Sequence, residues 1–305
     1  MRKTIENKCE SLVSVVIPTY KRPVALDRAI NSVLAQTYSN VEVVVVDDNN
    51  PDTEGRLLTE EKMLLYKNNP RVHYIKHSHN KGGSAARNMG ARSSKSTYIA
   101  FLDDDDEYLP YKIQSQVQIL EAKGAEWAVC YSRYYSKKEN EKPVESREHE
   151  EGYLYLEALS QKICLAAGSN LLIKREAFES VGGFDESFIR NQDHEILTKL
   201  LKRYMIAYSA EPGLIVHVHA CDNPTNYELV IEKYICSFQS YIDELSDSDR
   251  AYFYRSINKS RFYYFFRNNH NYKKCINMLI NKDIRIVDVA SLLFLRGLTF
   301  LKGKL

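Results

Sequence analysis

The sequence has few cysteines, and their spacing excludes the usual roles of paired thiols. Six cysteines are spread over 305 residues, and none of them forms a Cys-x-x-Cys pair. Structural zinc sites are usually built from such pairs, so we expect no zinc centre. Disulfide frameworks are typical of much shorter secreted chains. We therefore interpret the cysteines as free thiols in a reducing cytoplasm.

The chain also lacks long apolar runs and a strong charge imbalance. No uncharged stretch reaches the ~20 residues that a helix needs to cross a bilayer. The first ten residues are polar and charged, which predicts no secretory signal. The net charge of +2 gives no indication of nucleic-acid binding. These absences predict a cytoplasmic protein that is soluble or lies at the inner face of the cell membrane.

Short apolar runs alternate with helical patterns over the first two thirds of the chain. Runs typical of buried strands lie at residues 12–17, 41–46, 72–75, 98–102, 169–173 and 214–219. Helical spacing of apolar residues lies at 26–34, 84–92, 176–181 and 193–204. This alternation predicts an α/β fold with a mostly parallel sheet.

The last part of the chain has only helical patterns. We predict one domain over residues 1–222 and a helical C-terminal extension over 223–305. Residues 284–305 place apolar side chains on one helical face and basic side chains on the other. Such a helix fits a membrane interface, and it equally fits packing on protein, including a second copy in a homo-oligomer. Residues 137–152 are dense in Lys and Glu, which predicts a solvated loop.

Polar side chains follow three of the predicted strands. Thr19 and Tyr20 follow the first, Asp48 follows the second, and the run Asp103–Asp106 follows the fourth. Ligands of parallel sheets bind at the carboxyl ends of the strands, so we expect these clusters to converge on one edge.

The acidic run Asp103–Asp106 is the strongest chemical signal. Carboxylates ~4–5 Å apart repel by about a kcal/mol in water, and a cation removes that cost. Mg²⁺ or Mn²⁺ usually binds one or two carboxylates together with substrate phosphates. The alternative is a solvated turn that caps the next helix. The position at a strand end favours a metal site with a diphosphate ligand.

The turn Pro18–Pro23 suits a nucleoside. Tyr20 can stack on a base, and Asp48 can accept a hydrogen bond from a ring N–H. A packing tyrosine and a turn aspartate are equally good interpretations. Arg87 can add positive charge for phosphates or lie on the surface.

Several segments resemble the family 2 glycosyltransferases with a GT-A fold, and they occur in the family's order. They are residues 13–20, 29–38, 42–48, 86–88, 98–106 and 182–186. The resemblance covers residues 11–220. It implies an inverting hexosyl or hexosaminyl transfer from a nucleoside diphosphate sugar, most often a UDP-sugar, assisted by Mn²⁺ or Mg²⁺. It also implies a glycan acceptor, polyprenol-linked in many bacterial surface-polysaccharide pathways.

The resemblance also implies roles for individual residues. The set that it assigns to the nucleotide-sugar is Pro18, Thr19, Tyr20, Arg22, Asp48, Arg87, Asp103 and Asp104. Asp105 falls on the metal position, and Asp103 is its partner in the D-x-D pair. His219, at the end of the last predicted strand, is a further candidate for the metal, although a structural histidine is equally consistent with the strand pattern.

Asp193 falls on the family's catalytic base. The family usually has a Glu-Asp pair at this helix start, and Gln192 replaces the glutamate here. Glu195 is a weaker candidate, and Asp193 can alternatively cap the helix. A single carboxylate that removes the acceptor proton, with a metal on the leaving diphosphate, is sufficient for inversion.

Two other functions fit parts of the pattern. A sugar-nucleotide nucleotidyltransferase also uses metal and diphosphate, but it predicts a glycine-rich first loop, and residues 18–23 contain no glycine. A non-catalytic nucleotide- or sugar-binding module is the second, and the presence of both Asp105 and Asp193 argues against it.

Overall fold

The computed structural model describes residues 11–218 and 227–289. Its contacts divide the chain into two units, one of residues 1–155 and 164–221 and one of residues 156–163 and 222–305. The short segment 156–163 belongs to the second unit, which nothing in the sequence pattern indicates. The division into a catalytic domain over residues 1–222 and a helical C-terminal extension over residues 223–305 stays a prediction.

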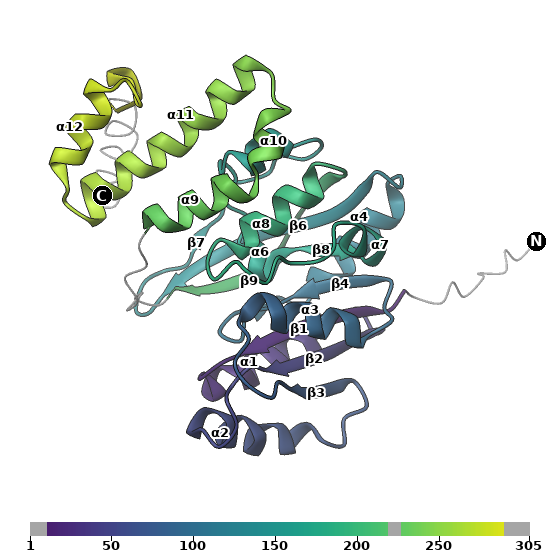
Figure 1. The fold of residues 1–305 in the computed structure, drawn as a ribbon. Coiled ribbons are helices and arrows are strands. Elements are labelled where there is room, and N and C mark those ends of the chain that lie inside the picture. The colour runs from purple at the N-terminus through teal and green to yellow at the C-terminus, as the bar shows by residue number, and fades with distance from the viewer. Residues whose placement is uncertain (1–10, 219–226, 290–305) are drawn as a thin grey trace, which may run out of the picture. The chain divides into compact units, whose positions relative to one another are not determined.

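The first unit is built on one sheet, whose described strands run in the order β3-β2-β1-β4-β8-β6-β9-β5, with β7 paired to β6 (Figure 1). The strands are β1 Val13–Thr19, β2 Val41–Asp47, β3 Val72–Lys76, β4 Tyr98–Phe101, β5 Glu107–Tyr108, β6 Trp127–Lys138, β7 Val144–Glu145, β8 Leu172–Lys174 and β9 Met205–Val218. The longest ladders, β1 with β2 and β6 with β9, are parallel. The predicted α/β fold with a mostly parallel sheet is confirmed.

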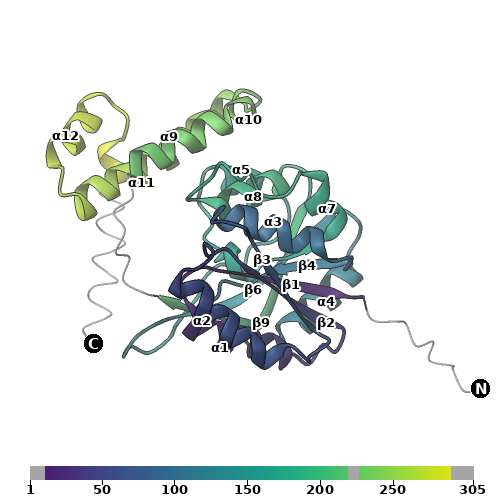
Figure 2. The same cartoon turned by 60° about the horizontal axis from the view of Figure 1, so that its bottom comes forward.

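Helices of the first unit cover both faces of this sheet. They are α1 Pro23–Leu34, α2 Glu54–Met63, α3 Gly83–Ser93, α4 Lys112–Ala122, α6 Ala167–Asn170, α7 Arg175–Ser180 and α8 Gln192–Leu201, with a 3-10 turn at Leu64–Tyr66. The remaining short helix, α5 Tyr155–Leu159, belongs to the second unit from Leu156 onward. Figure 2 shows α1 and α3 on opposite faces of the strands. Alternate residues of a strand point to opposite faces, so Val15 and Ile17 join the core cluster that includes Leu26 of α1. Gly90 of α3 lies against Val16, where an added Cβ would come within 2.3 Å of the valine.

Two predicted strands differ from the structure. Residues 167–170 form α6, and the strand begins only at Leu172. The Asn170 side chain explains the difference, because it hydrogen-bonds to the backbone of Ser132 on β6 and of Leu165 instead of facing a sheet surface. The last strand starts at Met205, earlier than predicted, and His219 lies outside the described residues.

The carboxyl ends of the parallel strands meet at one edge. Thr19 at the end of β1 pairs in register with Asp47 at the end of β2. β4 lies on the other side of β1 and delivers Asp103 to the same edge. The predicted convergence of the polar clusters is therefore seen directly, because Thr19 hydrogen-bonds to Asp104.

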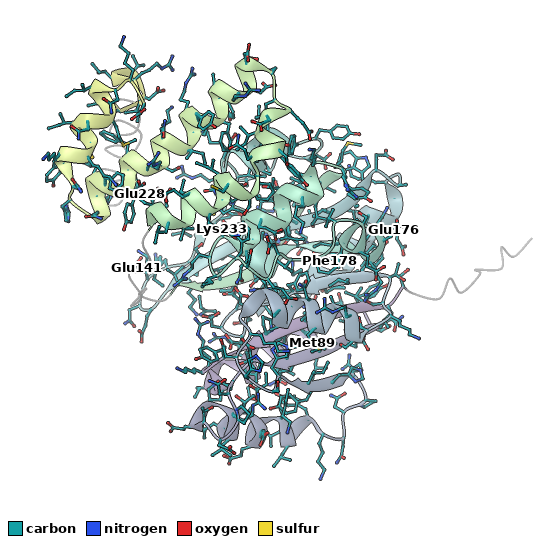
Figure 3. The ribbon with its side chains drawn as sticks, in the orientation of Figure 1. Met89, Glu141, Glu176, Phe178, Glu228 and Lys233 are labelled. Atoms are coloured by element: carbon teal, nitrogen blue, oxygen red, sulfur yellow. The ribbon has the colours of Figure 1, made fainter. Side chains whose placement is uncertain are left out.

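The second unit is helical in its described part beyond residue 226. Its helices are α9 Tyr227–Ser237, α10 Gln239–Asp243, α11 Asp247–Tyr263 and α12 Tyr272–Ile280, with a π-helical turn at Tyr264–Asn268. Glu228 on α9, labelled in Figure 3, accepts hydrogen bonds from Arg261 on α11 and Lys274 on α12, and so ties three helices together. Of the predicted amphipathic helix 284–305, only residues 284–289 are described. No described helix is long and apolar enough to span a bilayer.

Candidate active site

Two adjoining pockets lie at the carboxyl edge of the sheet. The β1 pocket, of about 410 Å³, is lined by Tyr20, Asp48 and Asp104 among others. The α8 pocket, of about 330 Å³, is lined by Asp106, Ser169 and Asp193 among others. Both pockets share a wall that consists of Arg87, Asp103, Ile189, Arg190 and Gln192. The edge therefore offers two connected chambers with acidic and basic side chains between them.

Asp104 is held by the turn that follows β1. The hydroxyl of Thr19 donates to its carboxylate at 2.7 Å, and Arg22 donates at 3.2 Å. Burial raises the pKa of Asp104 to about 7, against the lowering effect of these two donors. Thr19, Arg22 and Asp104 were each predicted to bind the nucleotide-sugar, and all three line the β1 pocket.

Asp103 and Asp105, the two members of the D-x-D pair, are each bound by an arginine. Arg22 forms an ion pair with Asp105, and Arg87 forms one with Asp103. Arg28 also donates to the backbone carbonyl of Asp105. These arginines remove part of the repulsion within the acidic run without any added ion.

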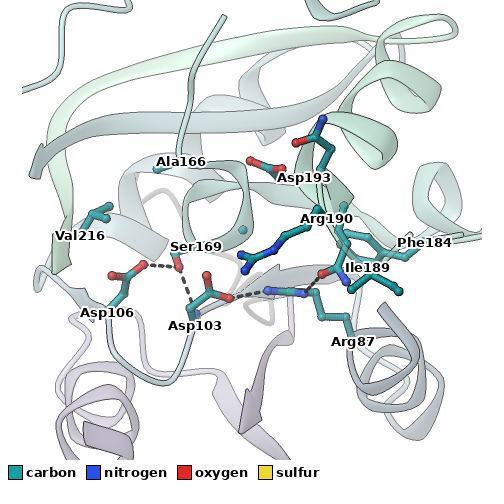
Figure 4. A pocket seen from close by; sticks show the side chains of 13 residues that line it. Arg87, Asp103, Asp106, Ala166, Ser169, Phe184, Ile189, Arg190, Asp193 and Val216 are labelled. Atoms are coloured by element: carbon teal, nitrogen blue, oxygen red, sulfur yellow. Dashed lines mark hydrogen bonds and ion pairs between the residues drawn. The ribbon is translucent and has the colours of Figure 1, made fainter. Parts of the chain in front are cut away.

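Asp106 orients the acidic loop. The Ser169 hydroxyl donates to its carboxylate and accepts the backbone N–H of Asp103 at 3.0 Å (Figure 4). The backbone N–H of His217 donates to its other oxygen at 3.0 Å. Burial raises the pKa of Asp106 to about 7, and the negative charge of Asp103 adds to the effect. Asp106 thus connects β9 and α6 to the loop.

Asp48 organises the entrance to α3. Its carboxylate accepts the backbone N–H groups of Lys81 and Gly82, both at 2.8 Å. It also contacts the ring of His77 at 2.7 Å and the amide of Asn80 at 2.9 Å. A nucleobase that binds Asp48 therefore has to share a carboxylate that already accepts hydrogen bonds from the protein. Tyr20 is more open, with 41% of its surface exposed.

Asp193 lies in the first turn of α8 and lines the α8 pocket. The residue at the cap position is Asn191, which has a left-handed backbone and makes no capping hydrogen bond through its side chain. Asp193 is therefore not the cap. Glu195 has a structural role, because it is buried, forms an ion pair with Lys199 at 2.7 Å and accepts the backbone N–H of Asp185.

Sequence reasoning missed two residues of the shared wall. Gln192 accepts a hydrogen bond from Arg87 at 2.8 Å and so aligns that arginine. Arg190 is exposed, and its side chain points into the α8 pocket (Figure 4). In the sequence Gln192 stands only as the replacement of the family's glutamate, and Arg190 belongs to no recognisable motif. Asn191 between them has a left-handed backbone and occupies the cap position of α8.

A model of the family described as glycosyl transferase family 2 matches residues 14–182, more than half of the chain. The chain belongs to glycosyl transferase family 2. The predicted resemblance is confirmed.

Individual relatives and structures agree with this family. An uncharacterised glycosyltransferase of Rickettsia felis is 28% identical over 88% of this chain, which spans 44% of that relative's length. The Escherichia coli protein WfaP, a UDP-Glc:α-D-GlcNAc-diphosphoundecaprenol β-1,3-glucosyltransferase, is 33% identical over 42% of this chain and 48% of its own length. The crystal structure of Staphylococcus aureus TarS 1–349 in complex with UDP-GlcNAc has a TM-score of 0.63 at 17% identity, covering 84% of this chain and 73% of TarS. That likeness confirms the GT-A fold.

Two carboxylates of the acidic run fit the divalent ion that the family resemblance implies. Asp103 and Asp105 offer carboxylate oxygens, the ligand type that Mg²⁺ and Mn²⁺ prefer. Within residues 11–218 and 227–289 no three His, Cys, Asp or Glu side chains form a metal cluster. Such ions usually take only one or two carboxylates and fill their shell with phosphates and water. An ion on Asp105 has to share the carboxylate with Arg22, which pairs with its Oδ2, and His219 lies outside the described residues.

Proposed function

We propose that the protein transfers a sugar from a nucleoside diphosphate sugar to an acceptor hydroxyl with inversion at the anomeric carbon. One observation carries this proposal. The carboxylate of Asp193 lines the α8 pocket, and that pocket shares its wall with the chamber that contains Tyr20 and Asp48. The catalytic base candidate therefore lies in one pocket and the nucleoside residues in the adjoining one. A nucleoside diphosphate sugar that extends across the shared wall would reach both.

The transfer needs a single displacement. The acceptor oxygen forms a bond to the anomeric carbon while the bond from that carbon to the phosphate oxygen breaks. The electron pair leaves with the diphosphate, and the acceptor proton passes to the Asp193 carboxylate. Because no covalent sugar–enzyme species forms, the configuration inverts.

The donor is held by residues at the strand ends. The chamber for the nucleoside is lined by Pro18, Thr19, Tyr20 and Asp48. The same chamber is also lined by the ion pair of Arg22 and Asp104. Asp105 and Asp103, with His219 as a third candidate, would hold Mn²⁺ or Mg²⁺. When bound, that ion neutralises the leaving diphosphate.

The comparisons support a UDP-sugar donor. WfaP is named for a UDP-sugar donor and a diphosphoundecaprenol-linked acceptor, and the TarS structure contains UDP-GlcNAc. We extend this to a glycan acceptor, polyprenol-linked, in cell-surface polysaccharide synthesis on the cytoplasmic side of the membrane. Peripheral membrane contact through residues 284–305 and a homo-oligomer stay predictions.

Ligand-induced thermal stabilisation tests the donor class. UDP, GDP and dTDP are each added with Mn²⁺, and we expect UDP to raise the melting temperature most. The protein with UDP-sugars should then release UDP as a glycan acceptor is consumed. A protein that instead consumes a nucleoside triphosphate and a sugar phosphate, and releases pyrophosphate, would be a nucleotidyltransferase and would contradict the proposal.

A further inference from the structure

Arg190 is a charged side chain at the site to which neither the sequence nor the family resemblance assigns a role. It lines both pockets and is exposed. No hydrogen bond or ion pair to it is present within residues 11–218 and 227–289. Its side chain points into the α8 pocket, on the side of the wall where Asp193 lies (Figure 4).

The two pockets fix where each part of a donor lies, given the proposed function. Tyr20 and Asp48 line only the β1 pocket, and Asp193 lines only the α8 pocket. The nucleoside therefore occupies the first chamber, and the anomeric carbon has to reach the second. The group that joins nucleoside and sugar is the diphosphate. It must cross the shared wall.

The shared wall carries two arginines, and only one of them has guanidinium N–H groups available for a ligand. Arg87 directs one terminal nitrogen to Gln192 and the other to Asp103, and its side chain is 10% exposed. Moreover, an added Cβ on Gly83 would lie 2.9 Å from the Arg87 guanidinium, so that arginine is tightly enclosed. Arg87 therefore has a structural role in the wall, whereas the Arg190 guanidinium has no partner within the described residues.

We propose that Arg190 binds the diphosphate of the donor and carries the negative charge that develops on it as the sugar leaves. A guanidinium pairs with phosphate oxygens through two parallel N–H donors, which suits a diphosphate at the crossing point. This assignment rests on the proposed function. It makes Arg190 a catalytic residue of this chain beside the metal carboxylates.

Nucleotide binding without metal tests this role directly. The dissociation constants of UMP and UDP are measured by calorimetry in EDTA for the wild type and for Arg190→Gln. We expect the variant to bind UDP about tenfold more weakly and UMP as the wild type does, because only UDP places a second phosphate at the wall. Arg190→Lys should recover part of the loss, since it keeps the charge but not the fork.

Arg92→Gln is the matched control. Arg92 lies on α3, its side chain is 65% exposed, and it lines neither pocket. Its replacement should leave both constants unchanged. With substrate, Arg190→Gln should lower kcat at saturating donor, because the charge that it meets grows in the transition state.

The outcomes separate the inference from the proposed function. If the wild type binds UDP more tightly than UMP and Arg190→Gln keeps the whole difference, Arg190 does not bind the diphosphate, while the proposed function stands. An equal weakening of UMP and UDP would also overturn the inference, because it would indicate a general distortion of the site. A wild type that binds neither nucleotide in EDTA would contradict the inference, because Arg190 would then not hold a diphosphate without metal. A wild type that binds no UDP even with Mn²⁺ would contradict the UDP donor.

Discussion

Lys112 at the start of α4 is fully buried, and within residues 11–218 and 227–289 its ammonium donates only to neutral oxygens. These are the side-chain oxygen of Gln116 at 3.1 Å and the backbone and side-chain oxygens of Asn170 at 2.7 Å and 3.1 Å. The ammonium also lies 4.9 Å from the ring centre of Tyr108. Burial lowers the pKa of Lys112 from 10.5 to about 7.

This pKa makes the stability of the protein depend on pH. Between about pH 7 and pH 10, the unfolded chain binds a proton at Lys112 that the folded chain does not. The free energy of unfolding therefore rises with pH in this window. With pKa values of about 7 folded and 10.5 unfolded, the rise from about pH 7 to about pH 9.5 amounts to about 3 kcal/mol. Below pH 7 both states carry the proton and the dependence disappears.

Urea unfolding of the wild type and of Lys112→Met at both pH values isolates this contribution. Methionine has nearly the same volume and no proton, so the variant should lose most of the rise. Burial raises the pKa of Cys130 to about 12, which gives an opposite slope in both proteins, because the thiol is present in both. Exposed Lys95→Met should behave as the wild type does. Parallel pH profiles of the wild type and Lys112→Met would refute a neutral buried lysine.

Three further substitutions test the hydrogen bonds, the ion pair and the helix packing that hold the residues around the site. Ser169→Ala removes the hydroxyl that joins Asp103 to Asp106, and we expect a loss of about 1–3 kcal/mol in urea unfolding together with a lower kcat; unchanged kcat would show that this link does not order the loop. Arg56→Met leaves Asp47 buried without its ion pair, and chemical denaturation should show a loss of about 3–5 kcal/mol; a loss below 1 kcal/mol would mean that the hydrogen bonds from Tyr74 and Asn49 satisfy the carboxylate without the arginine. Gly90→Val places methyl groups into Val16 and should lower stability by about 1–3 kcal/mol or more, measured in the same way; a neutral effect would contradict the close approach of α3 and β1.

The first four strands could be predicted closely from sequence. β1 and β2 lie inside a parallel sheet with helices on both faces, so nearly every residue is apolar and the run ends where the strand ends. The acidic run and the turn after β1 could be placed at one edge for the same reason, because parallel topology brings carboxyl ends together.

The second half of the sheet was harder to predict. β6 begins with buried residues and continues into partly exposed and polar ones from Arg133 onward, and the middle of β9 contains Pro212 and Gly213, which weaken a strand pattern. Residues 169–170 resemble the start of a strand in composition, but their side chains bond to the acidic loop and to β6. Such long-range contacts leave no periodic signal.

The roles within the site could be predicted only in part. The family resemblance selected Asp193, and the structure brings it to a pocket beside the acidic run. The arginine partners of Asp103 and Asp105 come from positions 16 and 83 residues away along the chain, and no local pattern connects them. Arg190 went unnoticed because an isolated arginine in a turn is usually a surface residue.

The role of Asp193 is the central claim, and transfer by Asp193→Asn tests it most directly. The variant keeps the size of the side chain and removes the base, so transfer from a UDP-sugar should fall at least about 100-fold. Metal-dependent UDP binding should stay as in the wild type, because Asp193 does not line the β1 pocket. Asp52→Asn, at an exposed turn residue, should change neither property. Wild-type turnover by Asp193→Asn would contradict the account and remove Asp193 from the role of base.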